Sequence, residues 1–381
     1  RDQMNGDLNS EEQAVIGQIE RFSCEVLAPA AAGIDAQGTF ATLHRPALAE
    51  MGIMGMNLPD SYGGIGLSGP ALYHAVEAIA GACGSTASML TAHFLATDSL
   101  LLGADEALKQ RLLPMAATGE ALGAFALTEP QAGSNPADMR STATREGDGY
   151  RLKGSKCFIS NAGGADFIVV YAKTDTTAGA RGVSAFVVEP RETDGVEIGK
   201  HEQTMGLRGG HVFPVSFDCY VPADNLLGAE GTGFRTAMKV LDNGRIEVAA
   251  QATGIAKAAL DAAVSYAKER TVGGHPIGDF QGLQWMLADC ATELAAARAL
   301  GLQAARKRGT GERYSSDSAF AKLYASEAAW RIADRALQIH GGYGYTRDFP
   351  LERYLRDLRI FRIYEGSSEI QRTIIARDLL K

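Results

Sequence analysis

The segment 362-RIYEGSSEIQRTIIARDLL holds the clearest candidate for chemistry in the chain. Glu365 stands in a predicted loop just before a helix, between an aromatic residue and Gly366. We expect Ser368 and Gln371 to cap that helix as a capping box. A carboxylate in this place is either a general base held at a rigid helix entrance or a solvated acid that favours the helix dipole by about 0.3 to 1 kcal/mol. The segment alone leaves both interpretations open.

Two further segments could together bind a planar ligand. In 125-FALTEPQAGSNP an apolar strand runs into Thr128 and is followed by small residues, which let a ring or a phosphate approach the backbone. In 156-KCFISNAGG, Phe158 and Ser160 stand at the end of another predicted strand. Paired, the segments predict an aromatic ring face and several backbone amides around a ligand. Separately, each is also typical of a strand end with a wide turn.

Three other patterns favour structure over chemistry. The loop 63-GGIGLSG matches the dinucleotide fingerprint by letter, but no strand precedes it and no βαβ unit follows, so we interpret it as a turn between helices. In 338-QIHGGYGY, Gly341 fits the C-cap of a helix. The arginines that recur every three residues from 353 to 362, interleaved with acids, indicate a salt-bridged surface.

The composition excludes several classes of protein. The 381 residues are 46% apolar and 22% charged, which is typical of a globular chain of two or three domains and excludes disordered or collagen-like chains. No apolar run reaches the roughly 18 residues of a membrane span, and the first thirty residues carry acids where a signal peptide would be basic and apolar. The five cysteines lie 59 to 74 residues apart, so we expect free thiols in a reducing compartment and no metal site.

The net charge of −8 is unevenly distributed. Lys and Arg number 5 against 14 Asp and Glu in residues 1–122, 10 against 14 in residues 123–232, and 22 against 17 in residues 233–381. An acidic protein repels nucleic acid. The local positive surplus therefore indicates either a solvated basic face or a site for a compact anion such as a phosphorylated cofactor.

The hydrophobic periodicity changes twice and predicts an α+β chain of three domains. Residues 1–122 have the pattern of short packed helices. Residues 123–232 hold short Val-, Phe- and Tyr-rich strands with a hairpin at Asp148-Gly149, which predicts an antiparallel sandwich or barrel without helical crossovers. Residues 233–381 predict an antiparallel four-helix bundle, with long helices at about 234–270, 281–308 and 317–340.

The order of these regions and a series of motifs resemble the acyl-CoA dehydrogenases over nearly the whole chain. The motifs are ALTEPQAGS, KCFISNAGG, MGLRGG, VPADNLLG, QGLQWMLAD, LQIHGGYGY and IYEGSSEIQR. The resemblance implies bound FAD, a homotetramer, and oxidation of an acyl-CoA to the trans-2-enoyl-CoA with electrons passed to an electron-transfer flavoprotein. The acidic charge and the lack of a membrane-length apolar run predict no nucleic-acid partner and no membrane insertion. The resemblance implies a place in the cytoplasm or, in a eukaryote, the mitochondrial matrix.

The resemblance also implies roles for individual residues. Glu365 falls where most of the family has its catalytic base. Expected flavin contacts are Phe125, Leu127, Thr128, Ser134, Phe158, Ile159, Ser160, Gly366, Ser367 and Glu369. Expected contacts with the rest of FAD are Arg270, Phe280 and Gln281, with Gln338, Gly341 and Gly342 donated by a neighbouring subunit. Expected acyl-CoA contacts are Ser134, Asp242, Arg245, Tyr364, Glu365 and Arg377.

The sequence departs from the family pattern at three places. Phe158 replaces the usual tryptophan over the flavin, and Gly273-Gly274 replaces the usual Phe-Gly, which removes an aromatic cofactor contact. Some relatives place their base in the helix after the β domain, where this chain has Asn243-Gly244, so no second base competes with Glu365.

Two rival functions and one substrate preference follow. An acyl-CoA oxidase shares the fold and base, but a chain this short favours the dehydrogenase; a non-catalytic flavin or acyl-CoA binding scaffold would not need Glu365. No Arg or Lys lies between Ala82 and Leu108, where the acyl tail is expected, so an uncharged short- to medium-chain acyl group, straight or branched, is favoured over a dicarboxylic one. Candidate tail contacts, which also fit plain core, are Met89, Leu90, Phe94 and Leu95.

Overall fold

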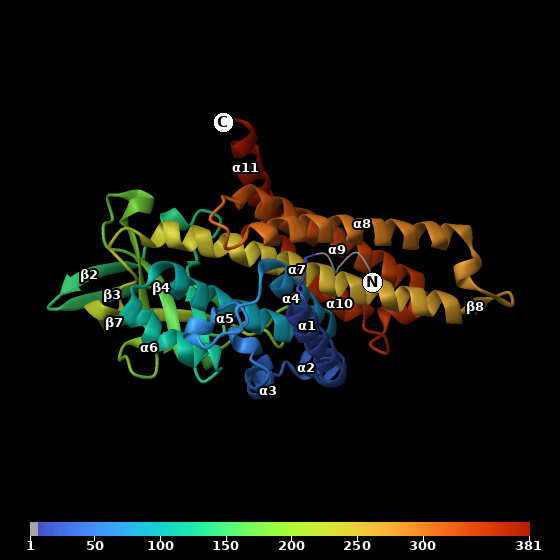
Figure 1. Cartoon of the computed structure of the whole chain (residues 1–381), viewed down its shortest axis with the longest axis horizontal. Coiled ribbons are helices and arrows are strands. Elements are labelled where there is room, and N and C mark those ends of the chain that lie inside the picture. Colours follow the sequence, from blue (N-terminus) through green and yellow to red (C-terminus); the bar gives the residue numbers. More distant parts are fainter. Residues whose placement is uncertain (1–6) are drawn as a thin grey trace.

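The computed structural model describes residues 7–381, with helical regions before and after a β region (Figure 1). The N-terminal helices are α1 (Ser10–Phe22), α2 (Ala28–Gln37), α3 (Arg45–Glu50), α4 (Gly69–Ala82), α5 (Gly84–Gly103) and α6 (Glu106–Ala117). Every residue of α5 from Gly84 to Leu100 is buried. Because α5 is mostly apolar or small, with His93 and Asp98 among its few larger polar residues, it packs as a central helix between the other regions.

The β region forms a seven-stranded sheet. Its strands are β1 (Gly123–Ala126), β2 (Thr142–Glu146), β3 (Gly149–Ser160), β4 (Phe167–Lys173), β5 (Val183–Val188), β6 (Val196–Ile198) and β7 (Val212–Pro222). β2 and β3 make the predicted hairpin. The expected antiparallel pairing holds for β2–β3, β3–β7, β4–β5 and β6–β7, but β4 runs parallel to β1 and to the start of β2. The long connection from β1 to β4 carries a hairpin in place of the usual crossover helix.

The C-terminal region is the predicted helical bundle. Its helices are α7 (Gly233–Glu269), α8 (Gln281–Lys307), α9 (Ser315–His340), α10 (Leu351–Leu358) and α11 (Ser368–Leu379). Helices α7, α8 and α9 lie side by side along the long axis, and α11 stands out from the body (Figure 1). The α+β fold class is confirmed. No helix among residues 7–381 is long and apolar enough to cross a membrane.

A tight hairpin joins α7 to α8. Its strands, β8 (Thr271–Val272) and β9 (His275–Pro276), are connected by Gly273 and Gly274, with φ of 59° and 86°. A two-residue turn with positive φ at both positions favours glycine. The departure from Phe-Gly in the sequence therefore has a backbone reason.

The arginines from 353 to 362 were expected to form a salt-bridged surface, but one of them also makes contacts inside the protein. Arg356 is largely buried, and its guanidinium pairs with Asp35 of α2 at 2.6 Å and with Glu352 of α10 at 2.6 Å. The neighbouring Asp357 accepts a hydrogen bond from the backbone N–H of Leu207 at 2.6 Å. This cluster ties the N-terminal helices and the β region to the chain just before Glu365.

A buried ion pair joins the ends of β1 and β3. The ammonium of Lys156 lies 2.8 Å from a carboxylate oxygen of Glu129 and also donates to the carbonyl of Leu127 at 3.0 Å, and both ionic side chains are almost fully buried. Glu129 accepts further hydrogen bonds from the backbone N–H groups of residues 140 and 141. Since every oxygen and the ammonium are satisfied, the pair holds the chain at the end of β1 against β3.

We predict that Lys156→Met lowers the free energy of unfolding by about 3 to 5 kcal/mol, because it leaves Glu129 as a buried unpaired charge. Urea unfolding followed by circular dichroism measures the change. Lys153→Met, on the exposed side of the same strand, is the control and should change stability by less than about 0.5 kcal/mol. Equal stability of the two variants would contradict the prediction.

Candidate active site

The loop that carries Glu365 is held in a left-handed conformation. Glu365 has φ 52° and Gly366 has φ 87°. The predicted capping box is wrong: Ser367 caps α11 by accepting from the backbone N–H of Ile370. Gln371 instead donates to the carbonyls of Glu365 and Gly366, at 3.2 and 2.9 Å. Left-handed backbone at a non-glycine residue costs on the order of 1–3 kcal/mol, so its surroundings must impose it.

Side chains of helix α9 also hold the loop that carries Glu365. The ammonium of Lys322 donates to the carbonyl of Gly366 at 2.7 Å. Glu327, one and a half turns further along α9, pairs with Arg362 at 3.0 Å and accepts from the hydroxyl of Ser368 at 2.7 Å. The chain is thus tied to α9 on both sides of Glu365.

The carboxylate of Glu365 lies against α7 at Gly244. A Cβ atom added to Gly244 would stand 2.2 Å from Oε2 of Glu365 and 2.8 Å from Cδ2 of Leu95. Any side chain at this position would therefore displace the carboxylate. Gly244, noted in the sequence only as a missing second base, supplies the space for Glu365.

One carboxylate oxygen of Glu365 is buried, and two cations act on it. Its Oε2 is enclosed and has no hydrogen-bond partner among residues 7–381. Burial raises the pKa of Glu365 to about 7, and the charges of Lys322 and Arg245 oppose that rise. Arg245 is itself paired with Asp242 at 2.7 Å. A carboxylate with a pKa near neutral pH and no fixed partner can take a proton from a bound molecule.

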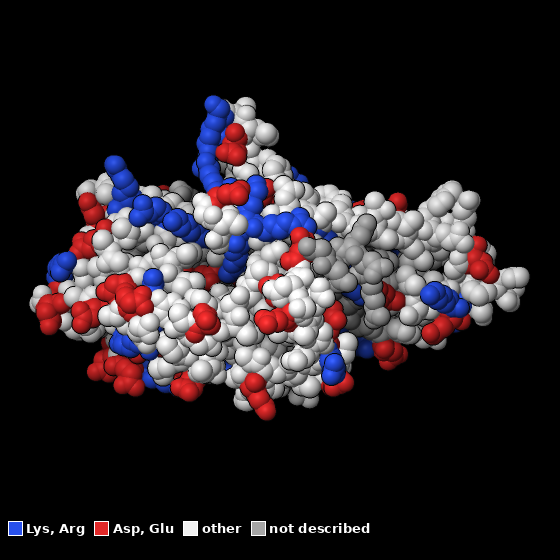
Figure 2. Space-filling view, viewed as in Figure 1, with Lys and Arg blue, Asp and Glu red and all other residues white. Residues whose placement is uncertain are grey.

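Several expected acyl-CoA contacts gather where α11 meets the bundle. Asp242 accepts from Arg245 and from the hydroxyl of Ser315, at 2.7 and 2.5 Å. Asp378, next to Arg377 on α11, accepts from the hydroxyl of Ser316 at 2.8 Å. Figure 2 shows Lys and Arg side chains gathered at the base of α11. Ser134 is placed on an exposed loop of the β region.

The two segments predicted to line a planar ligand are side by side. The backbone N–H of Cys157 donates to the carbonyl of Thr128 at 3.0 Å, which joins the end of β1 to β3. The β3–β7 register shifts between Lys156 and Ile159, and at this bulge Phe158 has φ 56° and is 64% exposed. The bulge turns the Phe158 ring out of the sheet while Ile159 stays buried. Phe125, Leu127 and Ser160 belong to the same two segments.

The residues expected to contact the rest of FAD lie at the far end of the bundle. Arg270, Gly341 and Gly342 line one pocket of about 450 Å³, with the Arg270 guanidinium 5.9 Å from the Tyr343 ring centroid. A Cβ atom at either glycine would meet nothing within 4 Å, which leaves room at the backbone. An arginine beside open glycine backbone fits a pyrophosphate. Expected contacts that are exposed around this end are Phe280, Gln281 and Gln338.

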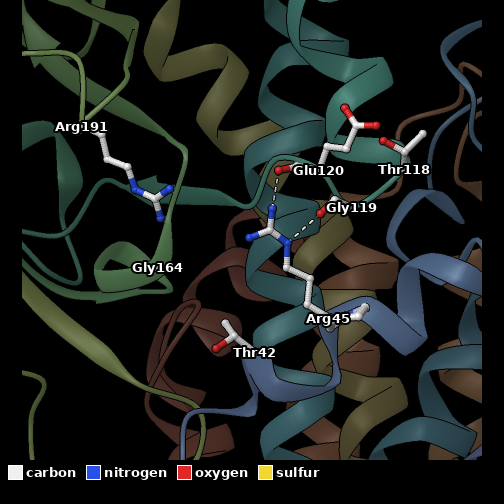
Figure 3. A pocket seen from close by; sticks show the side chains of 8 residues that line it. Thr42, Arg45, Thr118, Gly119, Glu120, Gly164 and Arg191 are labelled. Atoms are coloured by element: carbon white, nitrogen blue, oxygen red, sulfur yellow. Dashed lines mark hydrogen bonds between the residues drawn. The ribbon is translucent and has the colours of Figure 1, made fainter.

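A second pocket, of about 580 Å³, lies between the N-terminal helices and the β region (Figure 3). Arg45 and Arg191 face it, and both pair with Asp166, at 2.9 and 3.1 Å. Arg45 also donates to the carbonyls of Gly119 and Glu120. Because its arginines are already paired and none of the predicted site residues lines it, this pocket is not the candidate active site.

Three family models match consecutive parts of the chain. They are the N-terminal domain of acyl-CoA dehydrogenase over residues 9–120, the middle domain over 124–219 and the C-terminal domain over 231–380. The chain therefore belongs to the acyl-CoA dehydrogenase family. It is an FAD-dependent oxidoreductase of the class that acts on CH–CH bonds.

Similar proteins cover nearly the whole chain. It is 43% identical to acryloyl-CoA reductase (NADH) of Anaerotignum propionicum, over 97% of this chain and 95% of that protein. It is 40% identical to the short-chain specific acyl-CoA dehydrogenase of Clostridium acetobutylicum, over 99% and 100%. The structure of butyryl-CoA dehydrogenase from Megasphaera elsdenii matches with a TM-score of 0.96 and 39% identity, over 99% and 100%.

We predict that Gly244→Ala slows flavin reduction by an acyl-CoA about 100-fold, because the new methyl group displaces the Glu365 carboxylate from its resting place. Stopped-flow absorbance of the flavin measures the rate. Gly17→Ala on α1, where a Cβ atom meets nothing within 4 Å, is the control and should leave the rate unchanged. A wild-type rate in Gly244→Ala would show that the carboxylate acts from another position.

Proposed function

We propose that the protein oxidises an uncharged short- to medium-chain acyl-CoA to the trans-2-enoyl-CoA, with Glu365 as the base that removes the α-proton. The observation that carries this proposal is the enclosed, unpartnered Glu365 carboxylate over Gly244. The likeness to short-chain specific acyl-CoA dehydrogenase and butyryl-CoA dehydrogenase supports the short chain.

The chain's own residues bind and orient the thioester. No described residue accepts a hydrogen bond from the backbone N–H of Glu365, so this donor is free to meet the thioester oxygen, where negative charge develops. In this proposal Leu95, beside the carboxylate, and the neighbouring Tyr364 shield it from water once the substrate is bound. Asp242, Arg245, Ser134 and Arg377 contact the CoA portion. FAD, when bound, supplies the acceptor for the β-hydride.

The cofactor contacts imply that two subunits complete one site. From Gly244 to Arg270 along α7 is 26 residues, about 39 Å at 1.5 Å per residue. An FAD with its ring on the 125–128 and 157–160 segments would not be expected to reach Arg270 of the same chain. We therefore assign Arg270, Phe280, Gln281, Gln338, Gly341 and Gly342 to the FAD of a neighbouring subunit in a homotetramer. The flavin side of the site is completed by Gly366, Ser367 and Glu369.

Electrons pass from the reduced flavin to an electron-transfer flavoprotein in this proposal. The 43% identity with an acryloyl-CoA reductase favours a second candidate, the reverse reduction of an enoyl-CoA. Anaerobic bleaching of the flavin absorbance by butyryl-CoA tests the oxidation. Reoxidation of the bleached enzyme by electron-transfer flavoprotein, by oxygen or by an enoyl-CoA then identifies the acceptor.

We predict that Glu365→Gln keeps FAD but slows flavin reduction by butyryl-CoA about 100- to 10,000-fold, because an amide cannot take the proton. In the wild type only the carboxylate form acts, so the rate should rise as pH rises through about 7. Rapid mixing across a pH series measures both effects. The exposed Glu312→Gln variant is the control. Near-normal reduction in Glu365→Gln would refute the assignment.

The acyl tail is expected along α5. Of the four proposed tail contacts, Leu95 lies beside the Glu365 carboxylate, whereas Met89, Leu90 and Phe94 pack in the helical core. A cation does reach this helix from elsewhere in the chain. Arg308 donates to Asp98 of α5 at 2.9 Å and to Glu247 of α7 at 2.7 Å. Because two carboxyl groups already pair with Arg308, it cannot also neutralise a carboxylate on the substrate.

We predict that kcat/KM for glutaryl-CoA is at least about 100-fold below the value for butyryl-CoA, because a buried unpaired carboxylate costs several kcal/mol. A panel of butyryl-, isobutyryl-, octanoyl- and glutaryl-CoA with an artificial electron acceptor measures it. The uncharged members serve as controls for chain length and branching. A clear preference for glutaryl-CoA would overturn the expectation.

A further inference from the structure

We propose that Lys322 of α9 is a positioning residue for Glu365: its buried ammonium holds the loop at Gly366 and supplies the positive charge that keeps the neighbouring carboxylate ionised. This inference rests on the proposed role of Glu365 as the base. It assigns a task to a buried charged group for which the family resemblance implied none.

The contacts of Lys322 are unusual for a buried lysine. Its relative exposure is 0%, and its ammonium donates to the carbonyl of Gly366 at 2.7 Å. No carboxylate among residues 7–381 forms a direct ion pair with it, unlike the other fully buried lysine, Lys156, which pairs with Glu129. An ammonium buried without a direct counter-ion costs several kcal/mol.

Holding the loop does not by itself require a charge. The carbonyl of Gly366 already accepts a hydrogen bond from the neutral amide of Gln371, at 2.9 Å. Ser368 and Arg362 tie the flanks of the loop to Glu327. A neutral donor at position 322 would complete this set at lower cost, so the charge itself needs an explanation.

The electrostatic surroundings supply that explanation. Burial lowers the pKa of Lys322 to about 8 and raises that of Glu365 to about 7, and each charge favours the ionised form of the other. From α7, Arg245 and Glu247 also face the site, but Arg245 pairs directly with Asp242 and Glu247 with Arg308. Helix α5 presents the apolar Leu95, and the adjacent Tyr364 is neutral.

Lys322 is therefore the main uncompensated cation near Glu365. Glu327 pairs with Arg362 and Glu369 is exposed, so both act on Lys322 more weakly than Glu365 does. An opposite charge close to a carboxyl group lowers its pKa by about 1 to 3. Without Lys322, Glu365 would stay protonated and inactive to a higher pH.

The test compares Lys322→Met, which removes charge and donor, with Lys322→Gln, which removes the charge but keeps a donor. The rate of flavin reduction by butyryl-CoA is measured across pH. In both variants the midpoint of the rising limb should move up by about 1 or more, so that the rate at pH 7 falls about 5-fold or more and recovers at higher pH. Lys257→Met, at a half-exposed surface lysine of α7, is the control and should keep the wild-type midpoint.

The protonation of the Glu365 carboxyl group can also be measured without turnover. Infrared difference spectra across pH are recorded for the wild type, Lys322→Met and Glu365→Gln. The carboxyl band that is missing from Glu365→Gln should titrate near pH 7 in the wild type and at higher pH in Lys322→Met. The Gln variant takes the place of the Met variant in both measurements if the latter does not fold.

The outcomes separate the two proposals. Lower thermal stability of the Lys322 variants with an unchanged midpoint would overturn the present inference and leave Lys322 a structural donor. Normal flavin reduction by Glu365→Gln would overturn the proposed function instead. A raised midpoint in both Lys322 variants, with an inactive Glu365→Gln, supports both.

Discussion

In the proposed mechanism the Glu365 carboxylate must be shielded from water and still be ionised. This double requirement constrains much of the helical bundle. Enclosing Glu365 between α5 and α7 disfavours its charged form, and the neighbouring cations oppose that effect. The left-handed backbone that aims it costs free energy as well. These costs are offset by the close packing of α7 against α9, whose buried residues are mostly small, and by the bond from Lys322 to the loop.

The β region uses similar physics for a different purpose. Phe158, Asn161, Leu207 and Glu365 are the non-glycine residues with positive φ in the described chain, and two of them flank the end of β3. There the Lys156–Glu129 pair and the bulge set the backbone before the sheet ends. Strained backbone and buried charge occur together at both ends of the proposed site. Rigid surroundings are needed at each place to impose a conformation that the local sequence does not prefer.

The sequence predicted features that depend on local pattern. The limits of α7, α8 and α9 follow from helical periodicity, and the β2–β3 hairpin from Asp148-Gly149. The parallel pairing of β1 with β4 was missed, because register between distant strands leaves no local signal. Lys322 was also missed, although helical spacing places it with the buried Ala325 and Ala329, where a charged residue is a sign of function. The role of Gly244 became clear only from the structure, in which the Glu365 carboxylate lies against it.

The length of α7 links the binding of FAD to the assembly of subunits in the proposed function. The bundle end with Arg270 lies away from the β region, and it exposes large apolar side chains, with Phe280 at 47% and Trp285 at 62% exposure (Figure 1). Apolar surface beside a group that fits a pyrophosphate favours burial against another subunit over solvent. In the proposed tetramer one FAD contacts two chains, so it binds the assembled state more tightly than a separated chain. By mass action the cofactor then stabilises the assembly, and the assembly retains the cofactor.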